Sequence, residues 1–217
     1  MDPLIVVTDR RQADEAEHAL ADVVAQAVSG GARTVLLRDK DLARAQRRRL
    51  AGELLTVLAP VAGSLLVASD RDLAQAVGAA GVHLASDAGP VAGVAAPGAG
   101  PAAASAGAAP GSLTVGRSCH SVAELAAAQR EGLDYATFSP VWLTASKPGY
   151  GPALGLDGFA AGCAAVPGLP VYALGGVGRG RVAACIHAGA AGVAVMGAIM
   201  RADDPGKAVR TLLEEIP

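Results

Sequence analysis

The chain has 217 residues, a length at which a single domain is the ordinary expectation. Its formal net charge is −2, so its charge does not favour a nucleic acid or an anionic membrane surface as a partner. Hydrophobic residues make up 52% of the chain and aromatic residues only 3%, so the core must be built mainly from Ala, Val, Leu and Ile, which suits buried parallel strands.

The N-terminal sequence MDPLIVVTDR carries a charge at its second residue and has no long apolar run. It therefore predicts no secretory signal, and we expect a cytoplasmic protein. The cysteines Cys119, Cys163 and Cys185 are odd in number and lack the close spacing of a disulfide framework or a zinc site, so we expect neither.

Short apolar runs alternate with helix-like stretches eight times along the chain. The runs are bounded by Gly, Ser, Asp or Pro and do not alternate between polar and apolar residues, as expected for strands that are buried on both faces. They predict strands at Leu4–Thr8, Thr34–Leu37, Leu65–Ala68, Val82–Leu84, Leu113–Val115, Tyr135–Phe138, Val171–Leu174 and Val193–Met196.

The regular alternation predicts an α/β protein with a parallel sheet. Eight units favour a closed (β/α)8 TIM barrel that forms a single domain over residues 1–217. The alternative, an open doubly wound sheet, would place a G-x-G-x-x-G turn after the first strand. The chain reads Thr8-Asp9-Arg10-Arg11-Gln12 there, without a glycine.

Two helix starts carry clear capping signals. Ser121, with Glu124 three residues later, forms a capping-box pattern that predicts a helix through about Arg130. Asp204 before Pro205 predicts the start of the last helix.

One uncharged segment interrupts this regular pattern. Residues 88–116 carry no charge but contain four prolines, which prevent a regular helix. We expect residues 88–112 to form a loosely structured Ala/Gly/Pro-rich connection and not a membrane span.

Two cationic residues follow the second predicted strand. In a parallel barrel the carboxyl ends of the strands converge on one face, where barrel enzymes bind their substrates. Arg38 and Lys40 lie there on either side of Asp39. Because arginine grips a phosphate or carboxylate with two hydrogen bonds and lysine adds a point charge, the pair predicts anion binding at the mouth. A surface ion pair is the alternative.

Two histidines lie at strand ends. His120 closes the run Gly116–His120 after the fifth strand, where a histidine is suited to proton transfer near neutral pH. Alternatively, it caps the helix that starts at Ser121. His83 lies in the fourth strand and is a candidate to face the same pocket. Cys119 has no neighbour in sequence that indicates a lowered pKa, so we expect a small apolar filler.

The turns after the last two strands predict a phosphate site. Glycine lets backbone N–H groups approach an anion without a Cβ in the way, and barrels commonly bind phosphate at these turns. The expected phosphate-binding residues are Gly175, Gly176, Val177, Gly197 and Ala198.

The connection after the sixth strand, residues 139–151, is long and carries Thr144, Ser146 and Lys147. Long loops in compact domains are often lids. We expect these hydroxyl and ammonium groups to form a substrate loop that contacts a second anion or a substrate carboxylate.

Seven segments occur in a fixed order along the chain: Val6–Asp9, Val35–Lys40, Ser69–Arg71, Gly81–Leu84, Gly116–His120, Thr144–Gly149 and Leu174–Val177. In this order they resemble the thiamine-phosphate synthase/TenI family of (β/α)8 barrels over essentially the whole chain. The family holds two activities. A thiamine-phosphate synthase joins a pyrimidine diphosphate to a thiazole phosphate and uses Mg²⁺ to support the departing pyrophosphate. A TenI-type tautomerase aromatises the thiazole phosphate by a proton shift, with an active-site histidine and no metal.

Three positions depart from the synthase pattern that the resemblance implies. Leu36 stands where synthases usually carry a pyrimidine-reading glutamine, and Ser69 where they carry an asparagine. Ala88 stands at the second metal-binding aspartate, so that Asp87 would have to replace it beside Asp70. Because Mg²⁺ demands well-placed oxygen ligands, these losses favour a TenI-like thiazole tautomerase that needs no cofactor.

The expected site of such a tautomerase combines catalytic residues with further pocket residues: His120, Arg38 and Lys40, then Ser118, His83 and Ser69. Its partner is a small-molecule thiazole phosphate, with no nucleic acid and no membrane, and the resemblance implies a homodimer. One alternative is a thiamine-phosphate synthase with Mg²⁺ at Asp70. Others are a non-catalytic regulatory member of the family and, on fold grounds alone, a phosphosugar or tryptophan-pathway barrel.

Overall fold

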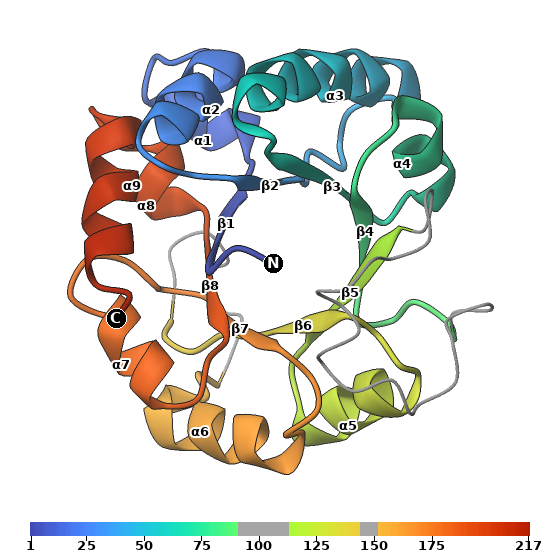
Figure 1. Ribbon diagram of the computed structural model, residues 1–217, viewed down its shortest axis with the longest axis vertical. Helices are drawn as coiled ribbons and strands as arrows, with labels where there is room; N and C mark the ends of the chain where they lie inside the picture. Colours follow the sequence, from blue (N-terminus) through green and yellow to red (C-terminus); the bar gives the residue numbers. More distant parts are fainter. Residues whose placement is uncertain (91–112, 144–151) are drawn as a thin grey trace.

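The computed structural model of the protein describes residues 1–90, 113–143 and 152–217. Its strands are all parallel, follow one another in chain order, and close into a barrel where β1 pairs with β8 (Figure 1). The predicted (β/α)8 TIM barrel is therefore confirmed. The strands are β1 (Leu4–Val7), β2 (Thr34–Leu37), β3 (Ser64–Ala68), β4 (Gly81–Leu84), β5 (Thr114–Cys119), β6 (Tyr135–Phe138), β7 (Val171–Leu174) and β8 (Gly192–Val195).

Helices surround the barrel (Figure 1). They are α1 (Arg10–Glu15), α2 (Leu20–Ser29), α3 (Arg44–Leu58), α4 (Arg71–Val77), α5 (Val122–Arg130), α6 (Gly155–Ala165), α7 (Val182–His187), α8 (Gly197–Met200) and α9 (Pro205–Glu214), with a short 3₁₀ helix, η1 (Ala59–Val61), after α3. Within the described ranges, no helix is long and apolar enough to cross a membrane. The expected loose connection over 88–112 lies, from residue 91 onward, outside the described residues.

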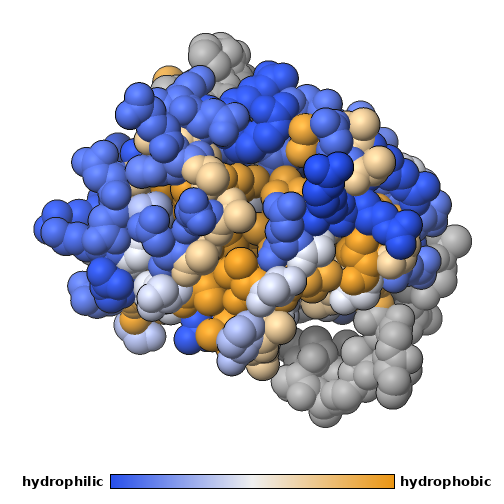
Figure 2. Space-filling view, turned by 90° about the horizontal axis from the view of Figure 1, so that it is seen from above, coloured by the Kyte–Doolittle hydropathy of each residue, from blue (hydrophilic) through white to orange (hydrophobic). Residues whose placement is uncertain are grey.

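The outer surface matches this layered arrangement. Seen from the side of α2 and α3, it is largely hydrophilic, with hydrophobic residues showing between the polar side chains (Figure 2). On this side, α2 and α3 turn polar residues to water and bury apolar ones such as Val23, Val24 and Leu54.

Both predicted capping residues begin their helices. Ser121 Oγ accepts a hydrogen bond from the backbone N–H of Glu124 at 3.2 Å, at the start of α5. Asp204 accepts one from the backbone N–H of Lys207 at 2.7 Å, with Pro205 as the first residue of α9. Each cap satisfies an N–H group that has no partner within the helix.

The fifth strand is longer than the sequence predicts. The expected strand ended at Val115, whereas β5 continues to Cys119. Its glycine has a packing reason, since a Cβ on Gly116 would lie 2.1 Å from the ring of Tyr135. The ring occupies the space that a side chain at position 116 would need, so only glycine fits there.

Side chains alternate along this extension. Arg117 is buried on the helix side of the barrel, where its guanidinium donates to Glu131 Oε1 at 2.8 Å. Ser118 consequently points into the barrel, and Cys119 points out and is fully buried. Burial raises the pKa of the Cys119 thiol to about 12, consistent with the expected apolar filler.

Two tyrosines fill the barrel interior towards its amino-terminal end. The rings of Tyr135 and Tyr172 meet edge to face with centroids 5.7 Å apart. A Cβ on Gly192 would lie 2.5 Å from Tyr172, so this ring too packs against a glycine. The Tyr172 hydroxyl donates to the backbone carbonyl of Asp2 at 2.9 Å, just before β1. Around these rings pack the inward aliphatic side chains Ile5, Val7, Leu36, Leu66, Ala68 and Ala194.

We expect Gly116→Ala to destabilise the fold by about 1–3 kcal/mol, because the new methyl group has no room beside the buried ring of Tyr135. Urea unfolding followed by circular dichroism measures the difference. Gly52→Ala is the control, since nothing lies within 4 Å of a Cβ at this position in α3, and alanine favours the helix. Equal unfolding midpoints for the Gly116 variant and the parent would contradict the packing described here.

Candidate active site

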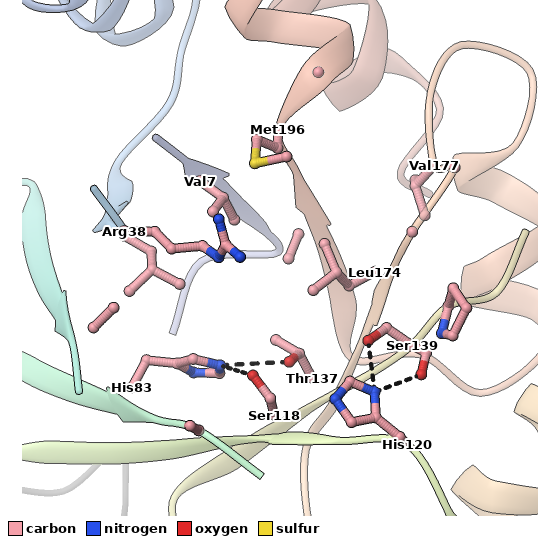
Figure 3. A pocket seen from close by; sticks show the side chains of 18 of the residues that line it. Val7, Arg38, His83, Ser118, His120, Thr137, Ser139, Leu174, Val177 and Met196 are labelled. Carbon is pink, nitrogen blue, oxygen red and sulfur yellow. Dashed lines mark hydrogen bonds between the residues drawn. The ribbon is translucent and has the colours of Figure 1, made fainter. Parts of the chain in front are cut away.

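A cavity of about 460 Å³ opens at the carboxyl ends of the strands (Figure 3). Most of the residues that the sequence predicts for a site line this cavity. They are Arg38, Lys40, His83, Ser118, His120, Gly175, Gly176, Val177, Gly197 and Ala198.

A buried carboxylate, Asp39, anchors the turn that carries the two cations at the mouth. Asp39 accepts a hydrogen bond from Thr8 Oγ1 at 2.5 Å and another from the backbone N–H of Arg10 at 2.8 Å. Thr8 Oγ1 in turn accepts from the backbone N–H of Arg38 at 2.9 Å. Because Asp39 is engaged with the chain after β1, its charge anchors the turn, while Arg38 and Lys40 reach the cavity.

The Lys40 ammonium lies in an unfavourable position for a cation. Burial lowers its pKa, and the neighbouring Arg38 lowers it further, against an opposing effect of Asp87. An anion bound between Arg38 and Lys40 would relieve this repulsion. The mouth of the cavity is therefore suited to a polyanionic group.

His83 is buried in the cavity wall and makes hydrogen bonds with both ring nitrogens. Nδ1 lies 2.8 Å from the hydroxyl oxygen of Tyr135, and Nε2 lies 3.0 Å from Ser118 Oγ. Burial lowers the pKa of His83 to about 3, assisted by the charges of Lys40 and Arg38. The ring is therefore neutral at physiological pH.

His120 follows β5 directly and is fixed at its backbone and its ring. Its backbone N–H donates to the Glu124 carboxylate at 2.6 Å. Its Nδ1 lies 2.8 Å from the backbone carbonyl oxygen of Ser139. Because a carbonyl can only accept, Nδ1 carries a proton.

The glycine turn after β7 is held against the chain after β6. Gly175 and Gly176 have φ values of 94° and 66°, in the left-handed region that favours glycine. A Cβ on Gly175 would lie 2.8 Å from Pro140, and one on Gly176 would lie 2.7 Å from Trp142. Arg181 donates to the carbonyl of Gly176 at 2.7 Å, and its guanidinium carbon lies 4.8 Å from the centroid of the Trp142 ring.

The turn after β8 completes this side of the cavity. Gly197 and Ala198 begin α8, so their N–H groups lie in a first helical turn, where no intrahelical carbonyl is available to them. Figure 3 shows Val177 on one side of the pocket and Arg38 on the other. The two expected anion sites are thus separate parts of a single cavity.

Four polar lining residues were missed by the sequence analysis: Ser86, Thr137, Ser139 and Arg201. Thr137 lies two residues after Tyr135 in β6, so strand alternation could have placed it inward. Ser139 follows the end of the same strand. No signal in the sequence marks Arg201, whose guanidinium donates to the side-chain oxygen of Gln12.

Two expected residues do not reach the cavity, and others cannot be placed. Ser69 does not line it; its backbone N–H donates to the carbonyl of His83 at 2.9 Å, and its φ is 58°. Asp70 is absent from the lining too. Residues Thr144, Ser146 and Lys147 lie outside the described residues.

The model of the family described as "Thiamine monophosphate synthase" matches residues 4–199. The chain belongs to this family. A "Putative thiamine-phosphate synthase" of Geobacter sulfurreducens is 37% identical over 99% of this chain and 94% of its own length. The "Thiamine-phosphate synthase" of Roseiflexus castenholzii is 38% identical over 96% of this chain and 86% of its own.

Solved structures are similar to this chain as well. A structure titled "Thiamine phosphate pyrophosphorylase" from Pyrococcus furiosus superposes with a TM-score of 0.77 at 28% identity, covering 98% of this chain and 94% of that one. A structure titled "Crystal Structure of 3-Hexulose-6-Phosphate Synthase" has a TM-score of 0.67 at 21% identity over the full length of both chains, which shows the shared barrel fold alone.

The expectation of a thiazole tautomerase is wrong by this comparison, because the curated relatives are named as synthases. It gave too much weight to Leu36, Ser69 and Ala88, each of which departs from the synthase pattern at one position. Similarity over nearly the whole chain outweighs these three differences.

The family implies Mg²⁺, and the donor set of the described residues does not fit it. Asp70 Oδ1 caps α4 by accepting from the backbone N–H of Leu73 at 2.9 Å. Its Oδ2 accepts from Arg47 at 2.7 Å and lies 3.5 Å from Arg44 Nε. Within the described part of the chain, no three His, Cys, Asp or Glu side chains converge on one point. Magnesium would have to displace two arginines from the carboxylate.

We expect Asp70→Ala to lower the unfolding free energy by about 1–2 kcal/mol, because it removes the cap of α4 together with a half-buried ion pair. Thermal and urea unfolding measure the loss. Asp72→Ala, in the same helix with an 85% exposed side chain, should change stability by less than about 0.5 kcal/mol. A fully stable Asp70 variant would show that the cap and the ion pair contribute nothing.

If the glycine turn binds the phosphate as expected, Gly176→Ala should weaken binding of thiazole phosphate about tenfold or more, because the added Cβ pushes against Trp142 and shifts the turn. Isothermal titration calorimetry measures the affinity. Gly180→Ala is the matched control: its φ is also positive, at 78°, but nothing lies within 4 Å of the Cβ. If both variants bind like the parent, the glycine turn does not hold the phosphate.

Proposed function

We propose that the protein is a thiamine-phosphate synthase, which joins a hydroxymethylpyrimidine diphosphate to a thiazole phosphate and releases pyrophosphate. The observation that carries the proposal is similarity to relatives named thiamine-phosphate synthase over nearly the whole chain. The cavity supports it, because one space combines a cationic mouth at Arg38 and Lys40 with a glycine turn on another side. Two phosphorylated substrates need two such regions.

The proposed reaction forms one bond and breaks one. The ring nitrogen of the thiazole attacks the methylene carbon of the pyrimidine, and the bond from that carbon to the diphosphate oxygen breaks. The electron pair leaves with pyrophosphate, and the positive charge remains on the thiazolium. Negative charge therefore grows on the departing oxygen, where Arg38 and Lys40 can hold it.

The cavity floor suits the aromatic rings of the substrates. Val7, Leu36, Ala68 and Ala194 line it with aliphatic side chains. Leu36 offers a pyrimidine an apolar contact and no hydrogen bond, so recognition of the ring must come from other groups. The Mg²⁺ of the family enters no step here, because the Asp70 carboxylate is engaged by Arg47 and by the backbone of α4.

The test is formation of thiamine phosphate by the purified protein from the two synthetic substrates, followed by fluorescence after oxidation to thiochrome phosphate. We expect product and stoichiometric pyrophosphate. A folded protein that yields neither, with and without added Mg²⁺, would contradict the proposal.

We expect Arg38→Ala to lower kcat/KM about 10- to 100-fold, because a charge-assisted hydrogen bond to the diphosphate is lost. Arg48→Ala is the control, since Arg48 is exposed on α3 and does not line the cavity. Steady-state rates at varied pyrimidine diphosphate measure the effect. Equal values for the Arg38 variant and the parent would remove this residue from the proposed diphosphate site.

A further inference from the structure

Three side chains from three neighbouring strands form a buried hydrogen-bonded chain that ends at the cavity. The Tyr135 hydroxyl of β6 lies 2.8 Å from Nδ1 of His83 in β4. Nε2 of His83 lies 3.0 Å from Ser118 Oγ in β5, with Thr137 Oγ1 more distant at 3.5 Å (Figure 3). The mechanism proposed above uses none of these groups.

The direction of the first hydrogen bond follows from burial. Tyr135 is 0% exposed, and among the residues that the structure describes, His83 is the partner of its hydroxyl. If Nδ1 carried the proton and donated to the tyrosine oxygen, the hydroxyl proton would be buried without a described acceptor. A buried donor without a partner is costly, so the tyrosine donates and Nδ1 accepts.

The direction of the second bond follows from the charge of the ring. Burial and the nearby cations Lys40 and Arg38 lower the pKa of His83 to about 3, so the imidazole is neutral and carries a single proton. Since Nδ1 accepts, this proton is on Nε2. Nε2 therefore donates to Ser118 Oγ.

A Ser118 hydroxyl that accepts a hydrogen bond from His83 can still donate its own proton to another acceptor. Ser118 lines the cavity, and Arg38 and Lys40, whose charges act on His83, lie at the same cavity. We infer that Tyr135 and His83 are positioning residues that fix the Ser118 hydroxyl as a hydrogen-bond donor to an anionic phosphoryl oxygen of the diphosphate ligand. With the opposite direction of donation, Ser118 would present only lone pairs to this anion.

The identity of the ligand rests on the proposed function, but the direction of the bonds does not. The probe is therefore inorganic pyrophosphate, measured by calorimetry without either organic substrate. Ser118→Ala and Tyr135→Phe should each weaken pyrophosphate binding about 3- to 10-fold. The double variant should be no weaker than Ser118→Ala alone, because the tyrosine acts only through the serine.

Tyr172→Phe is the matched control. It removes a buried tyrosine hydroxyl from the same interior, but one that donates to the Asp2 carbonyl at the other end of the barrel. Pyrophosphate affinity should stay at the parent value. Additive losses in the double variant, or equal losses in Tyr135→Phe and Tyr172→Phe, would overturn the inference.

A second measurement needs no variant. Nitrogen-15 NMR of the parent protein distinguishes the two neutral histidine tautomers, and we expect His83 with its proton on Nε2. A proton on Nδ1 would overturn the inference, as would a parent protein that does not bind pyrophosphate. If the coupling is found but no thiamine phosphate is formed, the proposed function fails and the serine donor stands.

Discussion

The packing of Tyr135 and Tyr172 against glycine is the constraint on which the rest of the structure depends. A barrel built from short aliphatic side chains leaves an interior that these chains alone fill poorly. Here two rings fill its amino-terminal part, and Gly116 and Gly192 give them room. Because the interior is closed below by these rings, the open space is left at the carboxyl ends of the strands, and the cavity forms there.

Side chains that anchor the scaffold and side chains that line the cavity have different environments. Asp39 and Asp70 resemble site residues in sequence, yet both carboxylates are held by hydrogen bonds within the scaffold. Lys40 and His83 show the opposite case, since burial destabilises the charged form of each. Arg38 and Lys40 are held close together at the mouth and form a preorganised anion site, whose repulsion is released when the ligand binds.

The sequence predicted the barrel, and most of the predicted site residues line the cavity, because both follow from strand ends. β6 and β7 lie where the apolar runs Tyr135–Phe138 and Val171–Leu174 predicted them. The predicted fifth strand ended too early, at Val115. Gly116 is required by the ring of Tyr135 on the next strand, and the local sequence pattern does not show this contact. The role of Asp70 was missed for a similar reason, because Arg47 reaches it from α3 only after the helices pack.

The ion pair of Arg117 also bears on how the barrel tolerates changes in chain length. The same guanidinium that meets Glu131 donates to the carbonyl of Gly89 at 3.0 Å, and β4 pairs directly with β5 from Gly81 and Thr114 onward. The residues at both ends of the connection between β4 and β5 are thus held at β5, Gly89 by a hydrogen bond and Thr114 as its first residue. Because these contacts are made at the two ends, a reporter domain inserted between Gly89 and Thr114 should leave the pairing of β4 with β5 in place.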